Sequence, residues 1–453
     1  MRGIAGALRR RGSGRLGDLV RGQGPPDAAS PPAAGSAEHA AELAELHARE
    51  GARTQEEVAL ARSPDGTAAS AYWTELALAQ VAARSAGPGM SPPRVARGLA
   101  MLEIAMHDAL VVTWAAKACY QRPSPAALDP SLSPVVRDRG VPAYPSEHAA
   151  LAGVAQVILP ALFPDAEDEL VALGERGAWS RLTAGAAHRS DVEAGLALGR
   201  AVARSVLEAR EGDGSATTSA VAAPAGPCIW RPTPPAFREG PLEPHWGGVA
   251  PFLMERGSQF RPPPPPACDS AEFHAQTEAL HRASLALTPE ERDLAQRWAG
   301  GPGTVTPPGM WLWMALNETR ERELSTMMTA RVMSHVAAAL ADAAIAAWDA
   351  KFTYWYERPV TTIRERIDPA WSPLLPTPPF PGYVSGHATF AGAATETLSH
   401  LFPEARDELT AVALEASASR FYGGIHIGAD NEEGLALGRS IGELAAARAA
   451  RAG

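Results

Sequence analysis

The segment PAYPSEHAALAGVAQVILPALFPDAEDELVAL, residues 142–173, resembles the segment PGYVSGHATFAGAATETLSHLFPEARDELTAV, residues 381–412. His148 in the first copy aligns with His387 in the second, 239 residues later, and the register continues without a gap through the hexapeptide GLALGR that both copies share. A match of this length at one fixed distance is the pattern of an internal repeat. We therefore predict that the chain consists of two related halves.

The residue pattern of each half is typical of helical bundles. Upstream of the first match, residues 96–120 align with residues 330–354 at a distance of 234 residues. Stretches rich in Ala and Leu alternate with breaks marked by proline, and within these stretches apolar residues stand at helical spacing. One such series is Leu99, Leu102, Met106 and Leu110. The pattern predicts an all-α protein with two related helical bundles.

Composition divides the chain into four expected regions. Residues 1–38 are basic and then rich in Gly, Pro and Ala, which predicts a disordered tail. The first bundle is expected over residues 39–221 and the second over residues 270–453. Between them, residues 222–269 contain RPTPPAF and RPPPPPAC, which is too much proline for a helix or a central strand. We expect this connector to run extended over the surface.

Charge and cysteine content exclude several classes of protein. The 453 residues carry a net charge of −10, whereas a general nucleic-acid-binding protein needs a broad basic face. The three cysteines are widely spaced and form no CxxC pair, so neither a disulfide framework nor a thiolate zinc site is expected. No stretch approaches the roughly 18 uncharged apolar residues of a membrane span, and the basic N-terminus lacks the apolar core of a signal peptide. We expect a cytoplasmic protein.

The second half contains three clusters whose residue types suit an anion site. The first cluster, WDAKFTYWYERP, has Lys351 and Arg358 seven residues apart. Two helical turns would place both cations on one face of a helix, which Pro359 would end just afterwards. A pair of this kind is, taken alone, more often solvated than functional.

The second cluster, FPGYVSGHATFAGAA, leads from a loop containing Gly and Pro into an apolar helical stretch. Ser385, Gly386 and His387 would open this helix. Unpaired backbone N–H groups and the positive end of the helix dipole favour an oxyanion there, and Ser385 can donate its hydroxyl. His387 would be a titratable group beside the anion. The tripeptide SGH is common by chance, so it is weakly specific alone.

The third cluster, SRFYGGIHIGADNEEGLALGR, contains Arg420, His426 and Asp430. The last two are four residues apart, one helical turn, which would let the carboxylate bind one ring nitrogen and direct the other toward the site. The structural alternative is a core histidine held by a nearby carboxylate. Together, the three clusters predict an oxyanion site with one histidine as nucleophile or ligand and a second as acid and base.

The combined pattern, K-x6-RP, SGH and SR-x5-H-x3-D, resembles the superfamily of vanadium-dependent haloperoxidases and type 2 phosphatidic acid phosphatases. One departure is Val384, which stands where the motif has proline. The resemblance implies two four-helix bundles, with vanadate or phosphate held at the end of one. It also implies five residues that bind the equatorial oxygens of this group: Lys351, Arg358, Ser385, Gly386 and Arg420.

The resemblance further implies roles in a reaction. His426 would be the axial ligand of vanadium or the nucleophile toward phosphorus, and Asp430 would orient it. His387 would act as acid and base on the opposite side, and Lys351 would polarise bound peroxide. Hydrogen peroxide and a halide, bromide or chloride, are then the expected substrates, with a small organic acceptor as a further partner. Exposed helical faces would allow a homodimer, whereas no nucleic acid or membrane partner is expected.

Three functions stay open at this point. The duplicated bundle, the absence of an expected membrane span, and the flanking aromatics Trp348 and Phe380 favour a haloperoxidase. The same residues would equally serve a soluble acid phosphatase with a phosphohistidine intermediate, because five-coordinate vanadate has the shape of the phosphoryl-transfer transition state. A helical interaction protein without catalytic activity is the third alternative.

The first half lacks the complete set of site residues. Ala187 aligns with His426, and Glu147 stands at the position of Gly386, where it would place a negative charge. His148 and Arg181 are therefore expected to be structural residues or relics. His188 lies one position after Ala187, the residue that aligns with His426.

Overall fold

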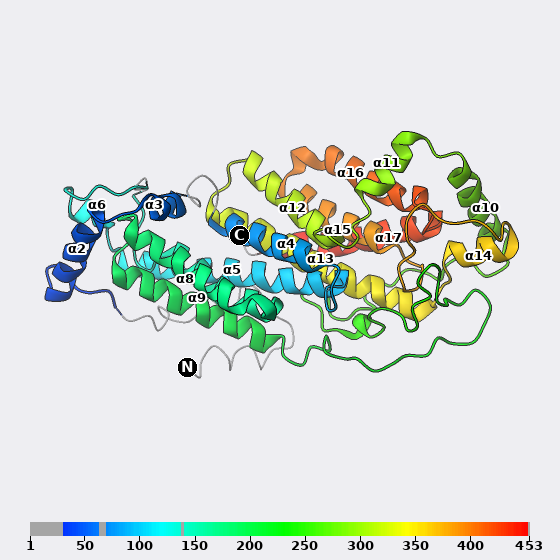
Figure 1. Ribbon diagram of the computed structural model, residues 1–453, viewed down its shortest axis with the longest axis horizontal. Coiled ribbons are helices and arrows are strands. Elements are labelled where there is room, and N and C mark those ends of the chain that lie inside the picture. The colour runs from blue at the N-terminus through cyan, green and yellow to red at the C-terminus, as the bar shows by residue number, and fades with distance from the viewer. Residues whose placement is uncertain (1–29, 63–68, 137–139, 452–453) are drawn as a thin grey trace. The chain divides into compact units, whose positions relative to one another are not determined.

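The computed structural model describes residues 30–62, 69–136 and 140–451. Within these ranges the regular structure is helical, and the only β pairing is an isolated bridge between Ile229 and Tyr356. The expected all-α class is confirmed (Figure 1). The helices are α2 (Ala37–Glu50), α3 (Gln55–Arg62), α4 (Ala69–Arg84), α5 (Pro92–Tyr120), α6 (Pro125–Leu128), α7 (Glu147–Leu162), η1 (Pro164–Ala166), α8 (Glu167–Thr183), α9 (Arg189–Ala209), η2 (Trp246–Gly248), α10 (Ala271–Leu285), α11 (Pro289–Arg297), α12 (Thr306–Glu321), α13 (Thr326–Tyr354), α14 (Pro359–Arg366), α15 (Gly386–Leu401), η3 (Pro403–Ala405), α16 (Arg406–Tyr422) and α17 (Gly428–Arg451).

The chain forms two compact units whose bounds differ from the expected continuous domains. Unit 1 comprises the described residues up to 80, Gly98–Glu211 and Leu316–Ser334, and unit 2 comprises Val81–Arg97, Gly212–Ala315 and the described residues from His335 onward. Four long helices, α4, α5, α12 and α13, contribute residues to both units. A repeat shows where two similar stretches begin, but it does not show which helices pack together.

The two copies of the repeat form the same series of elements. In the first copy α7, η1, α8 and α9 follow one another, and in the second α15, η3, α16 and α17 do so. Ser146 caps α7 and Ser385 caps α15, each by accepting a hydrogen bond from the backbone N–H three residues later. The long helices α5 and α13 have 29 residues each. These bounds agree with the repeat, and descent of the halves from one ancestor stays a prediction.

Small residues allow the helices of each unit to pack closely. In unit 2, a Cβ added at Gly438 on α17 would lie 2.2 Å from the carbonyl oxygen of Thr389 on α15. In unit 1, a Cβ at Gly199 on α9 would lie 1.9 Å from the carbonyl oxygen of Ala150 on α7. No side chain fits at these positions, so the backbones touch. In unit 2 this contact holds the start of α15 against the middle of α17.

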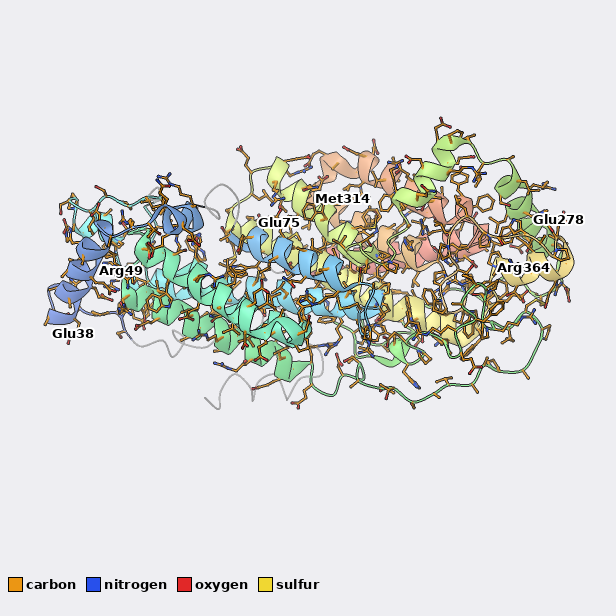
Figure 2. The ribbon with its side chains drawn as sticks, viewed as in Figure 1. Glu38, Arg49, Glu75, Glu278, Met314 and Arg364 are labelled. Atoms are coloured by element: carbon orange, nitrogen blue, oxygen red, sulfur yellow. A yellow bond between two sulfur atoms is a disulfide. The ribbon has the colours of Figure 1, made fainter. Side chains whose placement is uncertain are left out.

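Polar contacts of charged side chains join separate segments within each unit. In unit 1, Arg320 on α12 binds Glu75 on α4, with 2.5 Å between nitrogen and oxygen, and Glu75 is labelled in Figure 2. In unit 2, the carboxylate of Asp342 on α13 accepts backbone N–H bonds from residues 252–254. The second contact is buried and attaches the connector to the longest core helix of that unit.

Two helical segments are long and apolar enough to cross a membrane by length and composition alone. They are Pro92–Leu128 and Thr326–Tyr354, and 67% and 94% of their most apolar windows are buried within the protein. This burial is typical of core helices.

The connector, residues 222–269, runs over unit 2 without an α-helix, but buried side chains anchor it more firmly than a free spacer would be. It contains no α-helix, only the short η2, but Trp230, Trp246 and Leu253 within it are buried. Apolar residues between the proline runs explain the difference, because they bury surface that an extended linker would leave in water. Of the tail expected over residues 1–38, residues 1–29 lie outside the described ranges, and α2 begins at Ala37.

The structure contains one disulfide, which the cysteine spacing did not indicate, although a single bond is not the disulfide framework that the sequence argues against. Cys228 and Cys268 are bonded, with 5.8 Å between their Cα atoms and a separation of 40 positions in sequence. Cys119 is unpaired and exposed. Spacing along the chain does not show that the two ends of the connector return to one place, which is why the sequence missed the bond.

Candidate active site

All of the predicted site residues lie in unit 2, where the ends of five helices converge. Each is at or beside a helix terminus, where backbone groups have no partner within the helix. Lys351 lies in the last turn of α13, Arg358 caps α14, Ser385 caps α15, Gly386 and His387 open α15, Arg420 ends α16, and His426 and Asp430 flank the start of α17. The prediction that Ser385, Gly386 and His387 open a helix is confirmed.

Lys351 and Arg358 do not share one helix, contrary to expectation. Helix α13 ends at Tyr354, and Trp355 adopts a left-handed φ of 51° that turns the chain. Arg358 is extended, with φ of −91° and ψ of 149°, and Pro359 begins the next helix instead of ending this one. A left-handed tryptophan has no sequence signal comparable to glycine, so helical periodicity could not predict this break.

His426 and Asp430 form a buried hydrogen-bonded pair. Nδ1 of His426 lies 2.8 Å from Oδ2 of Asp430, although His426 precedes α17 and the pair is not one turn of a helix as expected. Asp430 also accepts from the backbone N–H of Ile427, at 3.3 Å, which anchors the loop. Because the carboxylate accepts from Nδ1–H, the lone pair of Nε2 is directed away from it, toward the other site residues.

Arg358 contributes a charged donor at the centre of the cluster. Its guanidinium is fully buried and donates from Nε to the carbonyl of Phe380, at 2.8 Å, and from Nη1 to that of Ile425, at 3.0 Å. Nη1 also lies 3.1 Å from Nε2 of His426. Nη2 is buried and has no hydrogen-bond partner among the residues that the structure describes. An unsatisfied buried guanidinium nitrogen is costly, so an anion would be favoured here.

Lys351 is placed differently from the role that the resemblance implies. Its ammonium donates to the carbonyls of Pro381, Gly382 and Val384, at 2.8, 2.8 and 2.5 Å. These three bonds use all three of its protons. Burial, followed by the charge of Arg358, lowers its pKa well below the usual range. In this structure Lys351 therefore holds the loop that leads into Ser385.

The start of α15 adds further donors beside these cations. The backbone N–H of Ser385 donates to the carbonyl of Asp430, at 2.8 Å, which fixes this helix end against α17. Ser385 is fully buried, and the first-turn N–H groups of Gly386 and His387 have no acceptor within the helix. A helix N-terminus in this position favours an oxyanion.

Arg420 and His387 form the opposite wall, and the segment around residue 300 closes over them. Nη2 of Arg420 donates to the carbonyl of Ala295, at 3.0 Å, and Nη1 lies 3.4 Å from Nε2 of His387. The backbone of Trp298 and Ala299 also lies beside His387, where it opposes the lowering of the imidazole pKa by burial and Arg420. The sequence analysis missed this segment, because its contribution is mainly backbone. The one available signal was the turn-forming run GGPG at residues 300–303.

Two aromatic rings complete the wall beside the cations. The rings of Trp348 and Phe380 lie 5.0 Å apart, and the ammonium of Lys351 lies 5.0 Å from the Phe380 ring centre. The guanidinium of Arg358 lies 4.9 Å from the same ring. These distances suit cation–π contacts, which help to hold buried cations that lack water. The sequence expectation that the two aromatics flank the site is consistent with this arrangement.

Burial and neighbouring charges set the protonation of the cluster. Burial lowers the pKa of Arg358 to about 10 and that of Arg420 to about 9, so both remain charged at neutral pH. Burial, reinforced by Arg358 and Lys351, lowers the pKa of His426 well below its usual range. Burial raises the pKa of Asp430 to about 7, against the opposing effect of the two cations. The site thus offers positive charge and a neutral imidazole.

This donor set fits a tetrahedral or five-coordinate oxyanion such as vanadate. Nη2 of Arg358 has no hydrogen-bond partner among the described residues, and Nε2 of His426 has a lone pair. The first-turn N–H groups of α15 lie at the same site. Within the described ranges, no three His, Cys, Asp or Glu side chains gather as they would around a metal ion. A single histidine with surrounding donors is instead the arrangement that an anchored oxyanion needs.

The aligned region of the first half keeps a histidine and aspartate pair in a different register. Nδ1 of His188 lies 2.9 Å from Oδ2 of Asp191, and both side chains are fully buried. Asp191 also binds Arg122, which in turn binds Glu42. The aspartate that corresponds to Asp430 is therefore neutralised internally.

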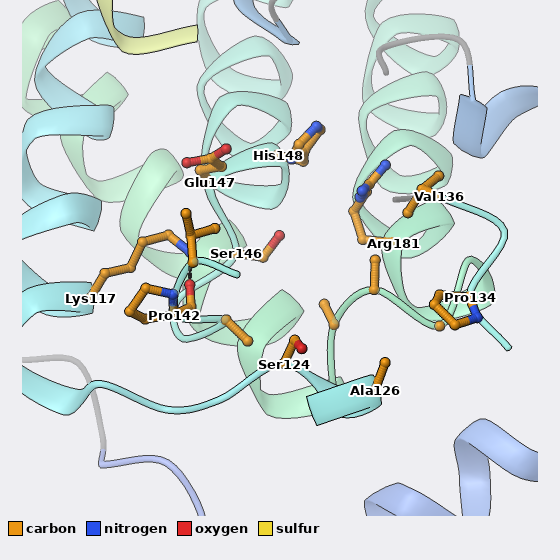
Figure 3. Close-up of a pocket in the computed structure, with 15 residues that line it drawn as sticks. Lys117, Ser124, Ala126, Pro134, Val136, Pro142, Ser146, Glu147, His148 and Arg181 are labelled. Atoms are coloured by element: carbon orange, nitrogen blue, oxygen red, sulfur yellow. Dashed lines mark hydrogen bonds between the residues drawn. The ribbon is translucent and has the colours of Figure 1, made fainter. Parts of the chain in front are cut away.

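His148 and Arg181, expected to be structural residues or relics, line a pocket in unit 1. Figure 3 shows this pocket with Glu147 beside His148 on α7, and with the ammonium of Lys117 bonded to the carbonyl of Pro142. The pocket has a volume of about 90 Å³ and is partly open to solvent. Because Ala187 stands where the second half has His426, no imidazole from that position can serve as a ligand.

The lowered pKa of His426 predicts a pH-dependent stability. Unfolding returns this imidazole to a pKa near 6.5, so below that pH the unfolded chain binds a proton that the native chain does not. The free energy of unfolding should therefore fall as pH falls below 6.5, by up to about 1.4 kcal/mol per pH unit from this group. In His426→Gln this contribution is absent. Asp430 acts with the opposite sign but is present in both proteins.

Urea denaturation of both proteins between pH 5 and pH 7 measures the difference. The free energy of unfolding of the wild type should decline more steeply on acidification than that of His426→Gln. Parallel curves would mean that His426 titrates normally in the folded protein.

Gly300 is predicted to control the space beside His387. Its φ is +60°, and an added Cβ would lie 3.0 and 3.1 Å from ring carbons of Pro307 and 3.4 Å from Nε2 of His387. Gly300→Ala should press on Pro307 and shift the segment that lies beside His387. We expect this to lower turnover by roughly tenfold to a hundredfold, on the order of the effect of a small misplacement of a catalytic group. Gly303→Ala is the matched control, because Gly303 has a φ of +84° with nothing within 4 Å of the added Cβ. Equal activities of the two variants would contradict the prediction.

Two family models match separate parts of the chain. The model described as the VCPO second helical-bundle domain matches residues 331–410 and 402–452, which include every predicted site residue. The model of the PAP2 superfamily matches residues 98–212 in the first half. The curated vanadium chloroperoxidase of Curvularia inaequalis is 26% identical over 223 residues. That alignment covers 40% of this chain and 37% of the relative's length.

Solved structures resemble the chain over most of its length. The crystal structure of a bacterial vanadium-dependent iodoperoxidase has a TM-score of 0.70 and 26% identity, covering 83% of this chain and 96% of that chain. A holo-type bacterial vanadium-dependent chloroperoxidase has a TM-score of 0.58 with 18% identity, over 80% of this chain and 93% of that one. The second likeness, at its lower identity, supports the fold alone.

Proposed function

We propose that this chain, which belongs to the superfamily of vanadium-dependent haloperoxidases and type 2 phosphatidic acid phosphatases, oxidises a halide with hydrogen peroxide at a vanadate anchored by His426. The observation that carries the proposal is the buried pair of His426 and Asp430 beside Arg358, whose Nη2 lacks a partner among the described residues. A similar iodoperoxidase structure aligned over 96% of its own length supports it.

The residues that would hold vanadate divide by chemistry. Nε2 of His426 would be its ligand, and Asp430 would keep that nitrogen unprotonated by accepting from Nδ1–H. The two guanidiniums and the start of α15 would neutralise the negative oxygens and orient them. When bound, vanadate supplies the Lewis acidity that activates hydrogen peroxide toward a halide. The residues in the second group are Arg358, Arg420, Ser385 and Gly386.

His387 would move the protons of the reaction. Burial and the charge of Arg420 lower its pKa well below the usual range, so its imidazole is neutral at neutral pH. A neutral imidazole can accept a proton from hydrogen peroxide at Nε2, which lies 3.4 Å from Nη1 of Arg420. Once protonated beside this cation, it would release the proton readily to the departing oxygen.

Lys351 would act first through the loop that it binds. Its three bonds to the carbonyls of the loop before Ser385 position the first turn of α15. The ammonium group itself lies close to that turn. A direct contact with peroxide, as the resemblance implies, would require the ammonium to give up one of these carbonyls. This role stays a prediction.

Halide preference and the organic acceptor are left to experiment. The sequence favours bromide or chloride, whereas the solved structure with the higher TM-score of the two described is of an iodoperoxidase. Trp348 and Phe380 form an apolar wall, which would suit a weakly hydrated halide and a small organic molecule. Comparing chloride, bromide and iodide as substrates decides the preference.

A phosphatase acting through a phosphohistidine at His426 is the alternative. The match of the PAP2 superfamily model to residues 98–212 favours keeping it, and the same donors would stabilise a phosphoryl-transfer transition state. Such an enzyme would need no peroxide and would be inhibited by vanadate.

The deciding experiment uses the protein loaded with orthovanadate. We expect it to brominate a diketone dye with bromide and hydrogen peroxide, and to lose this activity when either is omitted. Cleavage of p-nitrophenyl phosphate without peroxide, blocked by vanadate, would support the phosphatase. Neither activity, together with no vanadate retained in equilibrium dialysis, would support the interaction protein.

The cellular location and the oligomeric state of the protein are two further predictions. A cytoplasmic location stays a prediction, and the disulfide between Cys228 and Cys268 argues for an oxidising compartment, because the cytosol keeps most thiols reduced. Cell fractionation distinguishes the two. A homodimer also stays a prediction, which sedimentation of the purified protein tests.

A further inference from the structure

We infer that the strap, defined as residues 228–268 and closed by the disulfide between Cys228 and Cys268, is a positioning element that holds Arg358 in the anion site. The inference rests on the proposed function for its consequence, because it assigns Arg358 to the binding of an oxyanion. Its structural part stands on contacts of the strap alone. The strap is otherwise a proline-rich connector with no assigned role.

The first end of the strap pairs with the chain just before Arg358. The carbonyl of Cys228 accepts the backbone N–H of Glu357, at 2.9 Å, and the N–H of Trp230 donates to the carbonyl of Trp355, at 2.6 Å. These two bonds flank the isolated bridge between the strap and Tyr356. The irregular segment between α13 and α14 is thus paired with the strap, residue by residue, up to the position before Arg358.

The second end of the strap binds tyrosines on both sides of the site. The carbonyls of three prolines within residues 262–266 accept hydrogen bonds from tyrosine hydroxyls. The pairs are Tyr354 with Pro262, at 2.7 Å, Tyr383 with Pro263, at 2.7 Å, and Tyr356 with Pro266, at 2.9 Å. Two of these tyrosines precede Arg358, and the third lies in the loop held by Lys351. The strap therefore joins the backbone segment that leads to Arg358 with the loop that leads to the start of α15.

The middle of the strap supports the aromatic wall. The carbonyl of Leu242 accepts from Nε1 of Trp348, at 3.1 Å, and its N–H donates to the carbonyl of Pro379, at 2.9 Å. Pro379 precedes Phe380, whose carbonyl in turn accepts from Nε of Arg358. Both aromatic rings are therefore connected to Leu242 of the strap. Trp348 is bonded to it directly, and Phe380 is connected through the preceding residue, Pro379.

The disulfide fixes the two ends of the strap together. Nη2 of Arg366, on the helix that Arg358 caps, lies 3.7 Å from the sulfur of Cys228 and 3.8 Å from that of Cys268. Without the bond, each end can leave its partners independently, and Arg358 loses the support of the backbone that precedes it. Reduction by a dithiol exchanges this bond for two thiols, at Cys228 and Cys268, and leaves the dithiol oxidised to its own disulfide.

The experiment compares the double variant Cys228→Ser/Cys268→Ser with the wild type, and uses Cys119→Ser as the control. Cys119 is exposed and unpaired, so its replacement removes a thiol without touching the strap. Hydrogen exchange measured by mass spectrometry on peptides covering residues 352–358 should be faster in the double variant, because the N–H of Glu357 loses its fixed acceptor. Equilibrium dialysis should show phosphate and vanadate binding weakened by about 10- to 100-fold, the effect expected when a residue that positions a ligand is disturbed.

A milder variant keeps the test informative if the double variant unfolds. Tyr356→Phe removes only the hydroxyl that binds Pro266. It should weaken anion binding in the same direction without altering the far-UV circular dichroism. Wild type treated with dithiothreitol should behave like the double variant, with phosphate as the probe because this reagent also reduces vanadate.

Three outcomes separate the inference from the proposed function. Faster exchange and weaker phosphate binding would support the strap even if the protein fails to oxidise halide. Unchanged exchange at residues 352–358 and unchanged anion affinity in both the double variant and Tyr356→Phe would overturn it. Weaker binding in Cys119→Ser to the same degree would also overturn it, since the strap would then not be the cause.

Discussion

Replacing His426 with alanine is expected to lower bromide oxidation by the vanadate-loaded protein by about a thousandfold or more, as removal of a central catalytic group does in other enzymes. Nε2 of His426 is the neutral ring nitrogen that lies beside Arg358, and Asp430 fixes the direction of the ring by its contact with Nδ1, at 2.8 Å. Alanine leaves neither the ligand nor a substitute for it. Vanadate retention in equilibrium dialysis should fall together with the activity.

The matched control is His188→Ala in the first half. His188 forms a buried pair with Asp191, at 2.9 Å, so the variant removes the same kind of interaction outside the site. It should bind vanadate and oxidise bromide as the wild type does, once circular dichroism has established that both variants are folded. Loss of activity in His188→Ala but not in His426→Ala would place the reaction in the other half.

Replacing Arg358 with alanine should weaken the binding of phosphate and vanadate by roughly 100-fold, or about 3 kcal/mol, the effect of losing a buried charged hydrogen-bond donor. Arg358 is fully buried and its Nη2 has no partner within the described residues, so this nitrogen is available to an oxyanion. Isothermal titration with phosphate measures the change without requiring activity. The phosphate affinity of Arg358→Lys should lie between those of the wild type and Arg358→Ala. An ammonium keeps the charge but cannot reach both backbone carbonyls and the anion.

Arg364→Ala is the control for this variant. Arg364 lies on the same helix, α14, where Figure 2 labels it, and its Nε donates to the carbonyl of Trp371 rather than to the site. Its removal should leave phosphate affinity unchanged. If Arg358→Ala bound phosphate as tightly as the wild type, the anion would have to be held elsewhere.

The sequence predicted most of the helical framework because the repeat encodes it locally. Ser385 opens α15 with a side chain that caps the helix, and Ser146 does the same for α7. Prolines at residues 164 and 403 begin the short η1 and η3 elements in both copies. Such signals depend on a few neighbouring residues, so one sequence is sufficient to read them.

What the sequence could not predict depends on contacts between distant residues or on unusual backbone. The left-handed Trp355 separates Lys351 from Arg358, although their spacing suits one helix. The bond between Cys228 and Cys268 joins the ends of a 40-residue segment. The ranges of the two compact units likewise reflect how long helices pack rather than where composition changes.

The candidate site was predicted better in its residues than in its geometry. The side chains of Lys351, Arg358, Arg420 and His426 all converge, as their combined motif implies. Their partners, however, are largely backbone carbonyls, including those that use all three protons of Lys351. Carbonyl groups are present at every residue, so no motif marks the ones that position a site. The roles of these side chains in a reaction stay proposals.

A crystal structure of the protein soaked with orthovanadate tests the central claim most directly, since anomalous scattering locates vanadium without reference to activity. The account predicts one vanadium atom per chain in unit 2, bonded to Nε2 of His426, with oxygens facing Arg358 and the start of α15. Vanadium in the pocket of unit 1 lined by Glu147 and Arg181, or no ordered vanadium at a concentration that saturates binding in solution, would contradict it.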